Sequence, residues 1–138
     1  MTNLTHKARE VFAKDSFATN VTGVEITEVT WDHVRCSLML TNNHRNAMGA
    51  IMGGVLFTLA DLAFAIAANI RCLTEDQPLR WVSLSSNIQY LGQTDSNNIT
   101  AETVCVKHGK TTCVYNINIK DKHEKHIALV TTTGMCLN

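Results

Sequence analysis

The longest apolar stretch of the chain, IMGGVLFTLADLAFAIAANI, runs from Ile51 to Ile70. Its length matches a membrane span, but Asp61 lies near its middle, and a carboxylate there opposes insertion by about 2.5–3.5 kcal/mol. A helix with apolar residues on every side is also typical of a protein core. Because the strands predicted downstream need an apolar partner, we interpret the stretch as a central helix over residues 51–73 that does not cross a membrane.

The remaining apolar residues predict one further helix and several strands. Within residues 1–18, apolar residues recur at the spacing of one helical face, which predicts an amphipathic helix: Leu4, Ala8, Val11 and Phe12. Residues 34–40 alternate between apolar and polar positions, as a half-buried strand does, and residues 21–30 are its expected partner. Beyond Pro78, alternating runs predict further strands: Val82, Leu84, Ile88 and Tyr90; Val104 and Val106; Cys113, Tyr115, Ile117 and Ile119. A last strand covers about residues 127–135.

A tight hairpin is predicted at His108–Gly109, where glycine supplies the positive φ that a two-residue turn requires. With this turn, Val104 pairs with Cys113 and Val106 pairs with Thr111. The apolar residues of both strands then fall on the same face of the sheet, so the two alternations agree on one register.

Together these elements predict a single α+β domain over residues 1–138. Their order is a short helix, two strands, one long apolar helix and about four strands. A sheet with one apolar face and a helix of this kind bury each other. We therefore expect a curved antiparallel sheet of about five to six strands wrapped around one long central helix.

Composition narrows the class of partner and the compartment. Twelve Lys and Arg residues balance twelve Asp and Glu residues, so net charge favours neither nucleic acid nor an anionic membrane as partner. The first fifteen residues contain no apolar segment of a secretory signal, and we expect a cytoplasmic protein. Five scattered cysteines form no CxxC pair, which predicts reduced thiols and neither a disulfide framework nor a metal site.

Asp61 and the glycine pair Gly53–Gly54 are the candidate chemistry. A buried carboxylate is costly unless it is paired, hydrogen-bonded or neutralised, so Asp61 is either a structural hydrogen-bond acceptor or a base or nucleophile with a raised pKa. The glycines begin the helix, where free N–H groups and the helix dipole favour an oxyanion. Gly54 and Asp61 lie about 10 Å apart along the axis, so the two groups can meet at one carbon only if two copies of the chain pair.

The segment NAMGAIMGGVLFTLADLAFAIAAN, residues 46–69, resembles the Asn-x-x-Gly-x-x-His-Gly-Gly block, followed by an aspartate, of hotdog-fold thioesterases. It is most similar to the PaaI-like acyl-CoA thioesterase group, and the segments VSLSSNIQYL, VKHGKTTCVYNINIKDK and HIALVTTTG are similar to that group's later strands. The resemblance implies a hotdog fold and hydrolysis of an acyl-CoA to free acid and CoA. It also implies a homodimer, often a dimer of dimers. We expect no metal or other cofactor, since CoA is part of the substrate.

The resemblance also implies roles for single residues. Asp61 matches the carboxylate that activates water or attacks the thioester, and Gly53 matches the residue whose N–H polarises the thioester carbonyl. Asn46 matches a loop asparagine near that carbonyl, and Ser83 matches a hydroxyl that orients water across the dimer interface. The expected substrate-binding residues are Gly54, Lys107, His108, Gly109 and Lys110.

Two positions bear on these roles. Met52 stands where the family has a histidine, and a thioether does not hydrogen-bond as an imidazole does. The second hypothesis is therefore an acyl-CoA-binding protein of the same fold with little or no turnover. A hydratase of this fold is disfavoured, because the chain has no Asp–His pair at the required spacing. Ser83 alternates out of step with Val82 and Leu84, so it faces the helix only if the strand contains a bulge or begins there.

Overall fold

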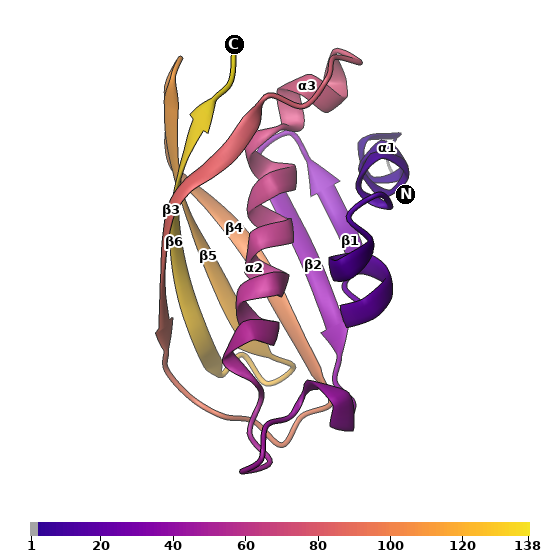
Figure 1. The fold of residues 1–138 in the computed structure, drawn as a ribbon, viewed down its shortest axis with the longest axis vertical. Coiled ribbons are helices and arrows are strands. Elements are labelled where there is room, and N and C mark those ends of the chain that lie inside the picture. Colours follow the sequence, from indigo (N-terminus) through magenta and orange to yellow (C-terminus); the bar gives the residue numbers. More distant parts are fainter. Residues whose placement is uncertain (1–2) are drawn as a thin grey trace.

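Six antiparallel strands curve around one long helix in the computed structural model, which describes residues 3–138 (Figure 1). The helical elements are α1 (Asn3–Phe12), the π-helical turn η1 (Phe17–Thr22), the short turn η2 (Asn42–His44), α2 (Gly53–Ala68) and α3 (Ile70–Thr74). The strands are β1 (Glu25–Thr30), β2 (His33–Met39), β3 (Trp81–Tyr90), β4 (Asn98–His108), β5 (Thr112–Asp121) and β6 (His126–Cys136). They lie in the order β1-β2-β4-β5-β6-β3. The predicted α+β class, with five to six strands around one central helix, is confirmed.

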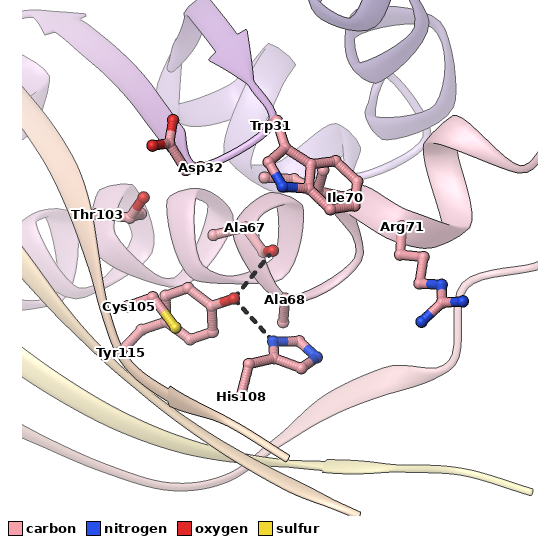
Figure 2. A pocket seen from close by; sticks show the side chains of 10 residues that line it. All are labelled: Trp31, Asp32, Ala67, Ala68, Ile70, Arg71, Thr103, Cys105, His108 and Tyr115. Carbon is pink, nitrogen blue, oxygen red and sulfur yellow. Dashed lines mark hydrogen bonds between the residues drawn. The ribbon is translucent and has the colours of Figure 1, made fainter. Parts of the chain in front are cut away.

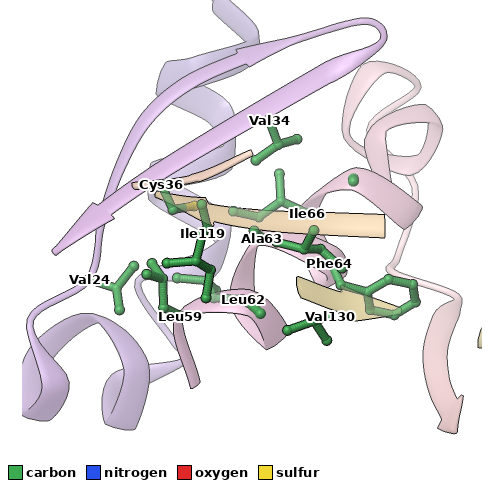
Figure 3. Packing of buried hydrophobic residues seen from close by; sticks show 14 of the residues in the cluster. Val24, Val34, Cys36, Leu59, Leu62, Ala63, Phe64, Ile66, Ile119 and Val130 are labelled. Carbon is green, nitrogen blue, oxygen red and sulfur yellow. The ribbon is translucent and has the colours of Figure 1, made fainter. Parts of the chain in front are cut away.

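The core lies between the concave face of the sheet and one side of α2 (Figure 3). Leu59, Ala63 and Ile66 recur at helical spacing and are fully enclosed. They belong to one cluster with buried side chains of the sheet, among them Val34, Cys36, Ile119 and Val130. Burying an aliphatic side chain contributes about 1.5–3 kcal/mol, so this layer fixes the helix on the sheet.

The N-terminal segment covers β1 and then turns back towards α2. The Thr5 hydroxyl of α1 donates to the carbonyl oxygen of Val29 over 3.2 Å and accepts from the Val29 N–H over 3.0 Å. η1 ends at Gly23, whose φ of 90° favours glycine. Because η1 takes up its first residues, the strand predicted over 21–30 begins later than expected. The first two residues of the chain, predicted to be helical, lie outside the described residues.

α2, which covers Gly53–Ala68, is shorter than the helix predicted over residues 51–73. Ile51 forms an isolated bridge with Arg45, and Met52 is extended with φ −64° and ψ 132°, so the helix begins at Gly53, two residues later than predicted. At the other end, Asn69 has φ −105° and ψ 13° and separates α2 from α3. No helix within residues 3–138 is long and apolar enough to cross a membrane.

The predicted register of β4 and β5 is wrong. Val104 pairs with Asn116 and not with Cys113, and His108 takes the position opposite Cys113. The turn lies two residues later than predicted, because the Gly109 N–H donates over 2.8 Å to the carbonyl oxygen of Thr112, so Lys110 and Thr111 connect the strands. His108 and Gly109 therefore lie before the turn, opposite residues of β5, and do not form it.

A bulge between Cys105 and Lys107 shifts the pairing by one further residue. It places Cys105 opposite Tyr115 and interrupts the alternation from which the apolar residues of β4 were expected to face the helix. Val104 and Val106 are instead 51% and 58% exposed. A one-residue shift moves side chains to the other face of a sheet, and here it moves two valines outward.

A second bulge, just after Ser83, reverses the two faces of β3. Ser83 lies opposite Gly134. A Cβ atom added to Gly134 would meet the ring of Phe64 in α2, so this position faces the helix. Ser83 therefore shares the concave face with Ile88, whereas Val82 and Leu84 turn outward and are exposed. The expectation that both would face the helix is wrong, and the bulge that Ser83 needs in order to face it is present.

Candidate functional site

One side of α2 is left open by the sheet. Four residues at spacings of three and four form this open stripe, and they are exposed or half-buried: Gly54, Thr58, Asp61 and Ala65. Asp61, the only charged residue of α2, is exposed in the single chain. The expectation that it is buried on all sides of a core helix is wrong, because the stripe faces away from the core.

Asp61 lines a cavity of about 340 Å³ between α2 and the N-terminal segment. Its lining includes the apolar side chains of Phe17, Phe57 and Leu62 and a second carboxylate, Asp15. Partial desolvation raises the pKa of Asp61, and the negative charge of Asp15 raises that pKa further. A carboxylate with a raised pKa is a stronger base than an ordinary aspartate, which suits proton transfer from water.

The first turn of α2 offers free backbone donors. None of the described side chains caps this helix, and Met52 at the cap position ends in a thioether. The N–H groups of Gly53 and Gly54 donate to no acceptor among residues 3–138. They lie at the positive end of the helix dipole, so together they can bind an anion or a polarised carbonyl oxygen.

Asn46 holds the loop that leads into α2. Its side-chain oxygen accepts hydrogen bonds from the N–H groups of Met48 and Ala50, each over 3.0 Å. Asn46 is exposed, so its side-chain nitrogen can donate to solvent or to a ligand. The buried His44 joins this loop to the helix, because its carbonyl oxygen accepts the Met52 N–H over 2.9 Å.

Ser83 lies near the opposite end of α2. Two residues before it, the backbone of Trp81 hydrogen-bonds in both directions with the side chain of Asn69, the residue that follows α2. The hydroxyl of Ser83 is exposed on the concave face of the sheet. In one chain, Ser83 and Gly53 are therefore separated by most of the length of the helix.

The turn of residues 107–110 lies at the same end of α2 as the beginning of β3, the strand that contains Ser83 (Figure 1). Figure 2 shows His108 in a cavity of about 320 Å³, where its Nδ1 lies 2.8 Å from the Tyr115 hydroxyl oxygen. Burial lowers the pKa of His108, so its imidazole is neutral near pH 7. The positive charge of the turn comes from Lys107 and Lys110, which are both exposed.

The predicted site residues thus form separate groups within one chain. Gly53, Gly54 and Asn46 lie at the beginning of α2, and Asp61 lies about 12 Å further along the axis. Ser83 and the turn 107–110 lie near the end of the helix. No single chain brings the Gly53 N–H and the Asp61 carboxylate to one reacting carbon.

Two contacts of the site were missed at the level of sequence. Tyr90 packs against Gly53, and a Cβ atom added to Gly53 would lie 2.9 Å from the Tyr90 hydroxyl oxygen. The shared alternation of Ile88 and Tyr90 was the available signal for this contact. Asp15 lies beside Asp61 in the cavity, and no periodicity links two residues so far apart in the chain.

Comparison with known proteins identifies the family. The model of the thioesterase superfamily matches residues 48–128, from the loop before α2 into β6. The chain belongs to the thioesterase superfamily, and the predicted hotdog fold and thioesterase resemblance are confirmed.

Particular relatives are similar along nearly the whole chain. Acyl-coenzyme A thioesterase PaaI of Escherichia coli K12 is 30% identical over 91% of this chain and 89% of its own. The solved structure of E. coli PaaI, from the phenylacetic acid degradation operon, has a TM-score of 0.84 at 26% identity and covers 99% of this chain and 97% of its own. A hypothetical thioesterase from Streptococcus pneumoniae TIGR4, solved with coenzyme A, has a TM-score of 0.75 at 27% identity and covers 94% and 97%.

Proposed function

We propose that this protein hydrolyses an acyl-CoA thioester to the free acid and CoA. The observation that carries the proposal is the open stripe of α2, on which Asp61 has a raised pKa and is not used by the core. The uncapped N–H groups of Gly53 and Gly54 at the start of the same helix supply the matching oxyanion donors. Relatives that are named acyl-CoA thioesterases support CoA as the carrier.

In the proposed reaction, the Asp61 carboxylate removes a proton from water, and the resulting hydroxide adds to the thioester carbonyl carbon. The carbonyl oxygen becomes an oxyanion that accepts hydrogen bonds from the Gly53 N–H and from the side-chain amide of Asn46. When the C–S bond breaks, the proton held by Asp61 passes to the departing CoA thiolate. Direct attack by Asp61 gives the same products through a mixed anhydride. When water attacks that anhydride at the Asp61 carboxyl carbon, a single turnover in ¹⁸O-water labels Asp61, whereas the general-base route labels only the free acid.

A homodimer is the smallest unit that completes this site. In a two-fold pair with antiparallel α2 helices, Gly53 of one copy faces Asp61 of the other. The open edge of β3 offers unpaired backbone groups through which the two sheets can join. The same pairing brings Ser83 and the turn 107–110 of one copy towards Gly53 of the other, where Lys107 and Lys110 can attract CoA phosphates. Dimers of dimers keep this arrangement.

The activity test offers the purified protein short-chain, medium-chain and aryl acyl-CoAs and follows release of the CoA thiol. Cys105 is exposed and reacts with thiol reagents itself, so a protein blank without substrate is essential. We expect turnover of at least one class, and Asp61→Asn should lower kcat by about 10³-fold or more. An Asp61→Asn variant with wild-type kcat would refute the proposed mechanism.

The alternative function is an acyl-CoA-binding protein with little or no turnover. Met52 favours it, because the helix start lacks a side chain that hydrogen-bonds to the thioester. If no substrate is hydrolysed while acyl-CoA still raises the melting temperature, the binding function stands and the enzyme function falls. Met52→His then shows whether an imidazole at the helix start supplies turnover.

A further inference from the structure

Tyr90 is the last residue of the edge strand β3 and lies on its concave face, opposite Ala128. Although this face is turned towards the core, the Tyr90 side chain is 58% exposed. Among residues 3–138, its hydroxyl makes no hydrogen bond. The ring instead lies over Gly53, where an added Cβ atom would be 2.9 Å from the hydroxyl oxygen and 3.1 Å from Cζ.

This contact places the hydroxyl beside a free donor of the backbone. In a helix every Cα–Cβ bond tilts towards the N-terminus, so the Cβ position of Gly53 lies on the side to which its N–H points. Covalent geometry separates N and Cβ by about 2.5 Å, so the hydroxyl oxygen is at most about 5.4 Å from the Gly53 nitrogen. Two hydrogen bonds of about 2.8–2.9 Å span that separation, so one acceptor oxygen can bind both groups.

We propose that the Tyr90 hydroxyl donates to the thioester carbonyl oxygen together with the Gly53 N–H. This inference rests on the proposed function. Met52, the side chain at the helix cap, has no donor, and Asn46 offers its side-chain nitrogen from the preceding loop, where its oxygen accepts from Met48 and Ala50. Tyr90 is therefore the hydroxyl that lies in contact with the helix start and is free to bind substrate.

The position of Tyr90 also accounts for glycine at residue 53. Any larger residue would push the phenol away from the helix start, since the closest contacts of the added Cβ atom are all atoms of Tyr90. Gly53 thus serves two purposes: its N–H is a donor, and its missing side chain admits a second donor. Each preorganised donor to a developing oxyanion is worth about 10²–10³ in kcat when it is the main one.

The first test is Tyr90→Phe, which keeps the ring and removes only the hydroxyl. We expect kcat to fall by about 10- to 100-fold with a much smaller change in KM, because the hydrogen bond strengthens as the oxyanion forms. The melting temperature should not change, since the hydroxyl makes no hydrogen bond with residues 3–138. Thr27→Val is the control, because it removes an exposed hydroxyl from the opposite edge strand and should leave kcat unchanged.

A second variant separates a donor role from packing. Met52→His places an imidazole donor at the same helix start, so it should restore part of the kcat lost in Tyr90→Phe, whereas Met52→Leu should restore none. Unchanged kcat in Tyr90→Phe, or equal effects of histidine and leucine at residue 52, would overturn the inference. Both results leave the thioesterase activity itself intact.

A spectroscopic readout makes the test independent of turnover. In the Asp61→Asn background, the carbonyl stretching frequency of a bound ¹³C-labelled thioester reports the hydrogen bonds to its oxygen. We expect this frequency to lie below that of free acyl-CoA and to move back towards it when Tyr90→Phe is added. An identical frequency with tyrosine and phenylalanine would overturn the inference even if the wild-type protein proves to be a binder.

Discussion

Asp61 lies between apolar side chains and a second carboxylate, Asp15, and both neighbours affect the pKa of Asp61. The cavity removes part of the water that would stabilise its charge, and Asp15 adds a negative charge from the N-terminal segment. Both effects disfavour the ionised form and raise the pKa of Asp61. A residue outside α2 therefore tunes the group on which the proposed reaction depends.

The substitution Asp15→Asn tests this tuning through the pH dependence of kcat/KM. In the proposed reaction ionised Asp61 is the active form, so activity should be lost as the pH falls through its pKa. A raised pKa places this acid limb of the pH profile above the ordinary range of aspartic acid. Removing the charge of Asp15 lowers the pKa of Asp61, so the limb should move to lower pH. It should not reach the ordinary value, because desolvation, the larger cause, remains.

Glu10→Gln is the matched control for Asp15→Asn. It removes a carboxylate from the same N-terminal segment, but Glu10 is exposed and forms its ion pair with His6 on α1. Its acid limb should coincide with that of the wild type. If Asp15→Asn and Glu10→Gln shift the limb equally, the effect comes from net charge and not from the contact in the cavity.

At the scale of elements, Asn69 connects the end of α2 to the beginning of β3. Its side chain is only 1% exposed, donates to the carbonyl oxygens of Ala65 and Trp81 over 2.8 and 3.1 Å, and accepts from the N–H groups of Arg80 and Trp81 over 3.0 Å each. This single amide satisfies backbone groups of two elements. It thereby joins the end of α2 to the beginning of β3.

Asn69→Ala should lower the free energy of unfolding by about 3 kcal/mol, because it leaves buried backbone groups without partners. Asn69→Asp keeps the acceptor oxygen but loses the donors, so it should fall between alanine and wild type. Urea denaturation followed by circular dichroism measures both. Asn43→Ala, in the exposed turn η2, is the control and should change stability by less than about 0.5 kcal/mol. A loss of similar size in both alanine variants would contradict the role of Asn69.

The strands show how far alternation predicts an element. It found the strands around Val34 and Ile117 because regular pleating places every second side chain on the core. It failed in β3 and β4, where one extra residue in each strand reverses the faces. Val82 and Val104 are apolar in sequence yet exposed in the single chain. A bulge leaves no signature in the alternation itself, since only the pairing strand shows which residue is extra.

At the scale of the whole molecule, the proposed site divides between two copies, because Gly53 and Asp61 of one α2 lie about 12 Å apart along the axis. A mixing experiment tests whether two copies complete it. Asp61→Asn removes the carboxylate. Gly53→Pro removes the backbone N–H at the first helical position, where the φ of proline is tolerated, and its ring also displaces the Tyr90 phenol, so this half of the site loses both donors. Each variant alone should be inactive.

If subunits exchange freely in an equal mixture, half of the dimers contain one of each variant, and one of their two sites is intact. The mixture should then recover about a quarter of wild-type activity. Light scattering should report a dimer or a larger even assembly before and after mixing. A mixture that stays inactive although exchange is demonstrated would place both groups of the site in one chain.

The sequence by itself determined the class of fold, the central helix and the identity of its candidate groups. These follow from local signals: a continuous apolar stretch, alternating strands, glycines at a helix start and one carboxylate on an apolar helix. Only the tertiary structure decided which side of α2 stays open, which face each end of β3 presents, and that Asp15 and Tyr90 lie beside Asp61 and Gly53. Those facts depend on bulges and on contacts between distant segments, and packing forms such contacts without any repeat in the sequence.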